Sequence, residues 1–206
     1  MLRFCNDIGM YALDRPREVS CVHRTDFCNR TCYNNKLERA FNGIKNRDVK
    51  NEEFWQSVTP QEMKKLLNRR TKSNKRIRLC TRGEPIADHT DVTRILGWAR
   101  ANPDWLWWVP TRAWRHEGLR LSIENTLMFE GNIRVLASVD PETPELDMFS
   151  LGRSEWSLLY YGDNDGLNLP FNFFKCPKTF KKIKGHCRTC MKGCFSPCST
   201  VHLKMH

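Results

Sequence analysis

The pattern that decides the fold class lies in residues 76–109, RIRLCTRGEPIADHTDVTRILGWARANPDWLWWV. Arg76–Thr81 alternates polar and apolar residues, which is typical of a β-strand. Asp91–Ala101 carries its apolar residues at helical spacing, and Trp105–Val109 is a short apolar run of the kind that forms a buried strand. A strand, a helix and a second strand in this order indicate an α/β unit with parallel strands.

The same succession of strands and helices continues on both sides of this unit. A helix start is expected at Thr59, because Thr59-Pro60-Gln61-Glu62 combines a capping hydroxyl, a proline in the first turn and an acid. Further helices are expected at Leu119–Phe129 and Glu145–Leu151, and further strands at Ile133–Ser138, Trp156–Tyr161 and Phe171–Phe174. We therefore expect an α/β fold with a mostly parallel sheet, as a partial barrel or as an open sheet. In either case the site lies at the carboxyl ends of the strands.

Length and composition are those of a globular protein. The chain has 206 residues, of which 40% are hydrophobic and 28% charged, enough for one domain or for one domain with a small appendage. The longest apolar stretches are too short to span a bilayer, and the N-terminus has neither an apolar signal segment nor a small-residue cleavage site. We therefore expect neither a membrane protein nor a secreted protein, and a cytoplasmic location.

Ten cysteines in a chain without an export signal favour metal ligation over disulfides. Most of them fall in two groups, one near each end of the chain, while Cys5 and Cys80 are isolated. We accordingly divide the chain into a main domain, residues 1–174, and a cysteine-rich metal-binding extension, residues 175–206. The N-terminal thiol group consists of Cys21, Cys28 and Cys32, and the C-terminal thiol group consists of Cys176, Cys187, Cys190, Cys194 and Cys198.

The two groups differ in the number of ligands that they offer. Three closely spaced thiols, in what we expect to be a loop after a short strand, suit a site with one open coordination position. An iron–sulfur cluster is favoured there over zinc and over unligated cysteines. The C-terminal thiol group contains a C-x2-C kernel at Cys187 and Cys190, and four of its thiols complete either a tetrahedral zinc site or a second [4Fe–4S] cluster. A zinc knuckle that only folds the C-terminal tail is the structural alternative.

Three cysteines after the first expected strand, followed by the turn Gly83-Glu84-Pro85 after the second, resemble the radical S-adenosylmethionine (SAM) enzymes. The resemblance implies a partial (β/α)6 barrel in which the N-terminal thiol group holds three irons of a [4Fe–4S] cluster and the fourth iron chelates SAM. It also implies that Gly83 and Glu84 face the methionine moiety and bind its amino group. The chain departs from the common pattern in three ways, one of which is that the aromatic residue, Tyr33, follows the last cysteine instead of preceding it. Its spacing is C-x6-C-x3-C instead of C-x3-C-x2-C, and Arg82 replaces the first glycine of the turn.

Other residues take roles from the same resemblance. Ser138 and Asp140, at the end of an expected strand, occupy the place where these enzymes contact the ribose of SAM; a plain turn role suits Asp140 equally. Arg112 is expected to reach the SAM carboxylate or an anionic substrate, and Tyr33, which follows the last cysteine of its group, is counted among the cofactor-binding residues. The implied reaction is the reductive cleavage of SAM to methionine and a 5′-deoxyadenosyl radical, which abstracts a hydrogen atom from the substrate.

A second resemblance covers nearly the whole chain. A family of phage and mobile-element proteins is similar to this sequence in a C-x5–6-C-x3-C-Y motif, here Cys21–Tyr33, and in a segment that here reads Asn102-Pro-Asp-Trp-Leu-Trp-Trp-Val-Pro-Thr111. The similarity extends to the cysteine-rich end and implies a radical-SAM-like phage protein in the host cytoplasm. For the C-terminal metal site it favours the four ligands Cys176, Cys187, Cys190 and Cys194, with Cys198 as an alternative ligand.

The formal net charge of +11 is concentrated in two stretches, Lys64–Arg78 and Lys175–Lys192. Basic clusters of this density neutralise phosphates, so DNA or RNA is the expected partner, with an acidic electron donor and a merely solvated face as the alternatives. Two other function classes remain open. One is a zinc-stapled basic nucleic-acid-binding protein without catalysis, and the other is a non-catalytic phage iron–sulfur protein that binds a host partner.

Several isolated residues have both a functional and a structural interpretation. His23 and His89 are weighed as donors to a sulfur or to substrate, against a structural or solvated role. Cys80 is expected to be a buried small hydrophobe. His202 and His206 have the spacing of a helical metal-binding pair, but we expect them in a frayed tail.

Overall fold

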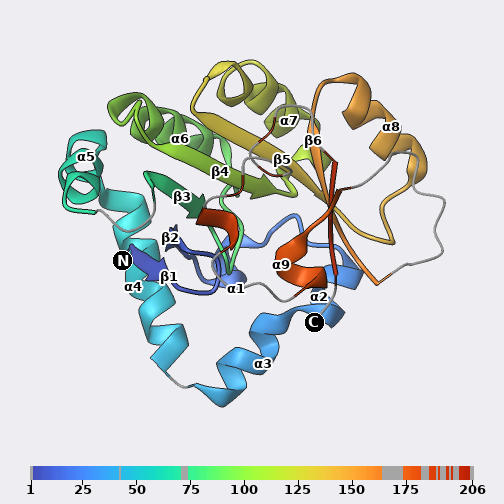
Figure 1. Ribbon diagram of the computed structural model, residues 1–206, viewed down its shortest axis with the longest axis horizontal. Coiled ribbons are helices and arrows are strands. Elements are labelled where there is room, and N and C mark those ends of the chain that lie inside the picture. The colour runs from blue at the N-terminus through green and yellow to red at the C-terminus, as the bar shows by residue number, and fades with distance from the viewer. Residues whose placement is uncertain are drawn as a thin grey trace.

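The computed structural model describes residues 2–41, 43–70, 74–163, 174–181, 186–188, 190, 194, 196 and 200–204. The strands are β1 Arg3–Cys5, β2 Met10–Leu13, β3 Arg76–Leu79, β4 Leu106–Thr111, β5 Ile133–Val139, β6 Ser157–Tyr161, β7 Phe174–Lys175 and β8 Thr200–Leu203. In the described residues they form one eight-stranded sheet in the order β1-β2-β3-β4-β5-β6-β8-β7 (Figure 1). The pairing of β1 with β2 is antiparallel, and the other pairings are parallel. The fold is therefore mixed α/β with a mostly parallel sheet, as the sequence predicts.

Helices separate most of the parallel strands. They are α1 Arg17–Ser20, α2 Asp26–Thr31, α3 Tyr33–Ala40, α4 Gly43–Ser57, α5 Pro60–Asn68, α6 His89–Ala101, α7 Glu117–Glu124, α8 Glu145–Arg153 and α9 Pro177–Phe180, with 3-10 turns η1 Ala113–Arg115, η2 Leu127–Phe129 and η3 His186–Arg188. Helices α5, α6, α7 and α8 form an arc along one side of the sheet, and α9 lies on the other side (Figure 1). Within the described residues, no helix combines the length and the apolar composition that a membrane span requires.

The two faces of the sheet carry two hydrophobic clusters, because successive residues of a strand point to opposite sides. In β4, Trp107 belongs to a large buried cluster with Trp98 of α6. Its neighbour Trp108 belongs to a second cluster, which contains Cys176 and Cys187. Helices thus cover one face of the sheet, and the C-terminal segment covers the other.

The strand–helix–strand unit predicted from residues 76–109 is confirmed, with small shifts at its boundaries. β3 ends before Cys80, whose backbone is left-handed with φ 58°. α6 begins at His89, earlier than expected, because the Asp88 carboxylate caps it by accepting a hydrogen bond from the N–H of Asp91 at 3.0 Å. Local capping chemistry therefore set a boundary that hydrophobic periodicity alone did not locate.

The remaining predicted elements are present with two differences. Thr59 and Glu62 form a reciprocal capping box at the start of α5, as the sequence predicts. The helix expected over Leu119–Phe129 divides into α7 and η2, because the backbone of Thr126 leaves the helical conformation with φ −133° and ψ −74°. Of the strand expected at Phe171–Phe174, only Phe174 lies in the described residues, as part of β7.

Two expectations are wrong. The N-terminal thiol group lies only partly in a loop, since Cys28 sits inside α2, which Thr25 caps by accepting a hydrogen bond from the Cys28 N–H at 3.0 Å. His202 is not in a frayed tail: it is buried in β8, where its Nε2 lies 2.8 Å from the carbonyl oxygen of Gly162. Parallel pairing with β6 orders this last strand. Cys198 and His206 lie outside the described residues.

The C-terminal residues that the structure describes join the same sheet as the rest of the chain. β8 pairs with β6, and β7 pairs with β8. A further link is the ion pair of Lys178 on α9 with Asp7 in the β1–β2 turn, at 2.7 Å. The two ends of the chain are therefore brought together over one face of the sheet.

Candidate functional site

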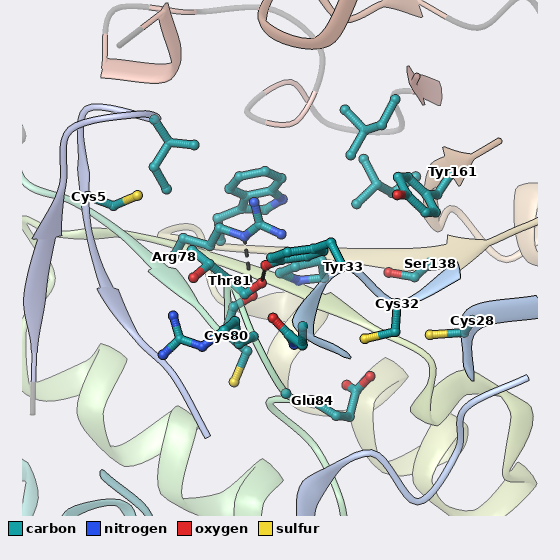
Figure 2. Close-up of a pocket in the computed structure, with 18 of the residues that line it drawn as sticks. Cys5, Cys28, Cys32, Tyr33, Arg78, Cys80, Thr81, Glu84, Ser138 and Tyr161 are labelled. Carbon is teal, nitrogen blue, oxygen red and sulfur yellow. Dashed lines mark hydrogen bonds between the residues drawn. The ribbon is translucent and has the colours of Figure 1, made fainter. Parts of the chain in front are cut away.

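A cavity of about 460 Å³ opens at the carboxyl ends of the strands, and cysteines of both thiol groups line it. Figure 2 shows part of its wall, with Cys28 and Cys32 of the N-terminal thiol group and Glu84. Sites for small molecules and cofactors have volumes in this range. The segment after β2 contributes the N-terminal thiols, and the turn after β3 contributes Glu84. The cysteines that line the cavity are Cys5, Cys21, Cys28, Cys32, Cys80, Cys176, Cys187 and Cys194.

The N-terminal thiols are held by the ends of three short helices. Cys21 is the C-cap of α1, Cys28 lies in α2, and Cys32 joins α2 to α3. Burial raises the pKa of the Cys21 thiol to about 12, and the nearby Glu84 carboxylate acts in the same direction. Burial also raises the pKa of Cys28, while the guanidinium of Arg112 opposes this shift. Burial thus favours the protonated thiols of Cys21 and Cys28 when no metal is bound, and ligation of a metal would release their protons.

The turn after β3 is fastened directly to the segment that carries the first thiol. Gly83 has φ +81°, and a Cβ atom there would lie 2.4 Å from the carbonyl oxygen of Arg15. The backbone N–H of Glu84 donates to the Ser20 Oγ at 3.0 Å, one residue before Cys21. Only glycine permits this close approach, so the expected turn and the expected thiol segment are in direct contact.

Glu84 is a buried carboxylate at the wall of the cavity. Its Oε2 accepts a hydrogen bond from the N–H of Arg112 at 3.0 Å, and its Oε1 accepts a longer one from the N–H of Ile86 at 3.4 Å. Burial raises its pKa to about 7, although these donors and the Arg112 charge act in the opposite direction. A bound cation would remove this penalty on the ionised form, so the site is suited to an ammonium group.

Arg112 and Asp140 connect the strand ends to the thiol-bearing helix α2. The Asp140 Oδ2 accepts hydrogen bonds from the Thr25 hydroxyl at 2.7 Å and from the Arg112 Nη2 at 3.1 Å. Its Oδ1 accepts from the N–H of Glu142 at 3.1 Å, so protein donors occupy both oxygens. Arg112 and Ser138 line the cavity. Of the residues expected near SAM on this side, Arg112 and Ser138 therefore face the cavity, and Asp140 supports the helix that carries Cys28.

The described C-terminal thiols belong to the hydrophobic cluster that contains Trp108, and three of them, Cys176, Cys187 and Cys194, line the cavity. Cys176 and Cys187 are buried, and Cys190 and Cys194 pack against the same hydrophobic cluster. The Arg76 guanidinium holds the C-x2-C kernel in place, because its Nη1 donates to the carbonyl oxygens of Cys187 at 2.8 Å and of Cys190 at 2.7 Å. Burial raises the pKa of the Cys187 thiol to about 11, and the neighbouring thiolates add to this shift. The structure thus gathers the four expected ligands in one region.

The number of thiols in the N-terminal group bears on the metal group that it suits. In the described part of the chain, no three or more His, Cys, Asp and Glu side chains form a group that would hold a single metal ion. Structural zinc takes four protein ligands, whereas three cysteines hold three irons of a [4Fe–4S] cluster and leave the fourth iron open. Three thiols that face one cavity, with a carboxylate beside them, are a donor set that fits a cluster with an open iron.

Other residues singled out in the sequence have local structural partners. The Tyr33 hydroxyl donates to the carbonyl oxygen of Thr81, so Tyr33 closes the cavity over the turn after β3 (Figure 2). The ring of His23 lies 6.1 Å from that of His116, and burial lowers the pKa of His23. Cys80 is buried, as expected, although it also touches the cavity.

In the part of the chain that the structure describes, the basic stretch Lys64–Arg78 does not form one continuous surface. Its first residues lie on α5, but the strand alternation of β3 turns Arg76 and Arg78 toward the C-terminal segment and the cavity. Lys72 lies outside the described residues, as do Lys182, Lys184 and Lys192 of the second basic stretch. Part of the basic charge therefore belongs to the site itself.

Sequence reasoning missed two sets of buried polar partners. Ser20 connects the thiol segment to Glu84, and Thr25 connects it to Asp140. The sequence offered a signal for Thr25, because a threonine followed by an aspartate, here Asp26, is typical of a helix N-terminus. Arg15 is buried and binds Asp91 at 2.7 Å, which anchors the start of α6 behind the turn. Nothing local in the sequence reveals this pair, because its members come from distant segments.

Comparison with known proteins identifies the family of this chain. A family model described as gene product 88 matches residues 6–193. This chain belongs to the gene product 88 family. The match includes all of the N-terminal thiol group and most of the segment that carries the C-terminal group, and it fits the resemblance to phage proteins seen in the sequence. No curated protein and no solved structure matches the chain.

Proposed function

We propose that this gene product 88 family protein is a radical SAM-type enzyme with a [4Fe–4S] cluster on Cys21, Cys28 and Cys32. The observation that carries the proposal is the shared cavity. The three thiols and the buried carboxylate of Glu84 line it together, and both come from segments at the carboxyl ends of neighbouring parallel strands. Catalytic sites in sheets of this kind occupy that position.

The strand order supports the finer fold proposal of a partial (β/α)6 barrel. The parallel run β2-β3-β4-β5-β6-β8 would form it, with β1 added at one edge. The thiol segment follows the first strand of this run, and the Gly83-Glu84-Pro85 turn follows the second. This is the order of motifs that the resemblance to radical SAM enzymes implies.

Each residue then has a defined task. Cys21, Cys28 and Cys32 hold the cluster, and Glu84 binds the SAM amino group through its ionised carboxylate. Gly83 admits the close approach that places Glu84, and Arg112 fixes Glu84 through its backbone N–H. When bound, a reduced cluster would supply the one electron that breaks a carbon–sulfur bond of SAM, which gives methionine and a 5′-deoxyadenosyl radical. The walls of the cavity exclude water from that radical and orient the substrate.

We further propose that Cys176, Cys187, Cys190 and Cys194 hold a second [4Fe–4S] cluster, with zinc as the alternative metal. Four thiols leave no open position, so this site serves structure or electron transfer. Cys176, Cys187 and Cys194 line the same cavity as the first group, which supports a place near the substrate. A phosphate-bearing nucleic acid is the proposed substrate class, with a protein substrate as the alternative, in the reducing cytoplasm of a phage host.

The proposal is tested by purifying the protein without oxygen and measuring iron, sulfide and zinc. We expect a brown protein that contains iron and sulfide, and an EPR signal of the reduced cluster that changes when SAM is added. Cys28→Ala should abolish that change. A colourless protein that contains only zinc would instead support a zinc-stapled, basic nucleic-acid-binding protein. A protein with a fully loaded cluster, whose EPR signal does not change when SAM is added, would support a non-catalytic iron–sulfur protein that binds a host partner.

A further inference from the structure

Arg78 occupies a distinctive place on β3, on the face of the sheet that looks into the cavity. The register pairs it with Trp108 on β4, and its guanidinium carbon lies 4.4 Å from the centroid of the Trp108 ring. Stacking on an aromatic face fixes the plane of a guanidinium and stabilises its charge. Arg78 is therefore held in one orientation at the cavity wall, half-buried beside Tyr33.

Among the residues that the structure describes, no carboxylate pairs with Arg78, whereas most other cations of the cavity wall have such a partner. Those partners are Asp14 for Arg3 at 2.9 Å, Asp48 for Arg82 at 2.6 Å, Asp140 for Arg112 at 3.1 Å and Asp7 for Lys178 at 2.7 Å. Arg24 is exposed to solvent and donates to the carbonyl oxygen of Cys21 at 3.4 Å. Among the described residues, Arg78 is thus the half-buried cation of the cavity wall that no carboxylate pairs with.

The hydrogen-bonding capacity of Arg78 is also largely unused. Its Nε donates to the carbonyl oxygen of Cys80 at 3.3 Å. No acceptor within the described part of the chain takes a hydrogen bond from its two terminal nitrogens. A guanidinium with both terminal nitrogens available binds a planar or tetrahedral oxyanion through two parallel hydrogen bonds. A half-buried cation gains more from such a partner than an exposed one, because water screens the pair less.

We propose that Arg78 binds an oxyanion of the substrate, a phosphate or a carboxylate, in the cavity that cysteines of both thiol groups line. The inference rests on the proposed function only in taking this cavity as the active site. Figure 2 shows Arg78 and Tyr33 between Cys5 on one side and Cys32 and Cys28 on the other. An anion on Arg78 would therefore anchor the substrate beside the position assigned to SAM, which lies at Glu84 and the N-terminal thiols.

The competing role for Arg78 is that of a counter-charge for the C-terminal thiols. Its guanidinium lies close enough to Cys187 and Cys194 to favour their thiolates. In that case Arg78 would hold metal at the C-terminal site and would bind no added anion. Removal of the guanidinium distinguishes the two roles: anion binding is lost if Arg78 binds the substrate, and metal is lost if Arg78 only balances the charge of the thiolates.

The test is calorimetric titration of the anaerobically purified protein with inorganic phosphate and, separately, with acetate, alongside measurement of its iron content. We expect one of the two anions to bind, which identifies the oxyanion class. Arg78→Gln should weaken that binding at least tenfold, Arg78→Lys should retain part of it, and Arg153→Gln, which removes an exposed arginine on α8, should leave it unchanged. Thermal unfolding confirms that each variant is folded.

Two results would overturn the inference. One is that neither anion binds the natural protein, and the other is that the anion affinity of Arg78→Gln is unchanged, whether or not the variant loses iron. Titration with SAM separates this inference from the proposed function. Arg78→Gln should bind SAM normally, because SAM is assigned to Glu84. If the natural protein binds phosphate through Arg78 but does not bind SAM, the proposed function fails and the anion site stands.

Discussion

The Oγ of Ser20 accepts a hydrogen bond from the backbone N–H of Glu84 at 3.0 Å, and the same hydroxyl donates to the carbonyl oxygen of Pro16 at 2.8 Å. Ser20 is fully buried and directly precedes the first thiol of its group, Cys21. One hydroxyl therefore joins the proposed ligand segment of the cluster to the proposed ligand of the SAM amine. The relative position of the two functional motifs depends on it.

Ser20→Ala should destabilise the protein by about 1–2 kcal/mol, because it leaves the N–H of Glu84 buried without an acceptor. Denaturant unfolding measures the change. Ser57→Ala is the matched control: its hydroxyl also donates to a backbone carbonyl oxygen, that of Glu53, but it lies exposed at the end of α4 and its removal should cost less than about 0.5 kcal/mol. Equal effects of the two substitutions would show that Ser20 does not fasten the turn.

Gly83→Ala should destabilise the protein by about 2 kcal/mol or more, since the new Cβ would meet the Arg15 carbonyl oxygen at 2.4 Å and a φ of +81° is strained for alanine. The substitution should also weaken SAM binding, because it displaces Glu84. Gly43→Ala provides the control, because no atom lies within 4 Å of the position of its Cβ. Thermal unfolding of both variants measures their stabilities. A Gly83→Ala variant as stable as the natural protein would contradict the described turn.

Asp14 should contribute to stability in a pH-dependent way. Burial opposes its ionisation, but the guanidinium groups of Arg82 and Arg3 outweigh this effect and lower its pKa below the ordinary value of 3.8. Because the pKa of Asp14 is lowered in the folded protein, its carboxylate contributes its full stabilisation at pH values above the ordinary pKa. This contribution is lost as the pH falls through the lowered pKa of the folded protein. Asp14→Asn should therefore be about 1–3 kcal/mol less stable than the natural protein near pH 7. In acid, the difference in the free energy of unfolding between the two proteins should become smaller.

Urea unfolding at several pH values measures this difference. Asp104→Asn is the comparison, because Asp104 pairs with Lys75 at the exposed surface, where the effect should be smaller. An Asp14→Asn difference that stays constant between neutral and acid pH would mean that the carboxylate is not responsible.

The two thiol groups should lose metal independently. Cys28→Ala should remove the iron of the open site and leave the C-terminal metal in place, whereas Cys190→Ala should release the C-terminal metal and destabilise the segment that it closes. Iron content per chain, measured on protein purified without oxygen, distinguishes the two losses. If each substitution alone removes all bound metal, the chain has one metal site and not two.

The fold class was predictable because its signals are local. The strand–helix–strand pattern of residues 76–109 and the capping box at Thr59 depend on residues close in sequence, and the structure confirms both. Cys28 was misplaced in a loop, although Thr25 before Asp26 is a recognisable helix start. The position of β8 was not predictable, because its partners β6 and β7 lie far from it in the sequence.

The site was predictable in its components more than in its connections. The sequence indicated the thiols and Glu84 by residue type and spacing, and the structure gathers them around one cavity. The direction of Arg78 could not be inferred, since an arginine that alternates with apolar residues usually faces solvent. Only the C-terminal segment, which returns over that face of the sheet, makes the arginine a residue of the cavity wall.

The most direct test of the central proposal is to incubate the protein, with its clusters reconstituted, anaerobically with SAM and dithionite and to measure 5′-deoxyadenosine. The account predicts that 5′-deoxyadenosine forms, that Cys28→Ala abolishes it, and that Glu84→Gln strongly reduces it, because the amide can neither neutralise the SAM ammonium nor accept both backbone hydrogen bonds. Arg153→Gln should not affect it. A fully loaded cluster that forms no 5′-deoxyadenosine, in a protein that does not bind SAM, would contradict the account.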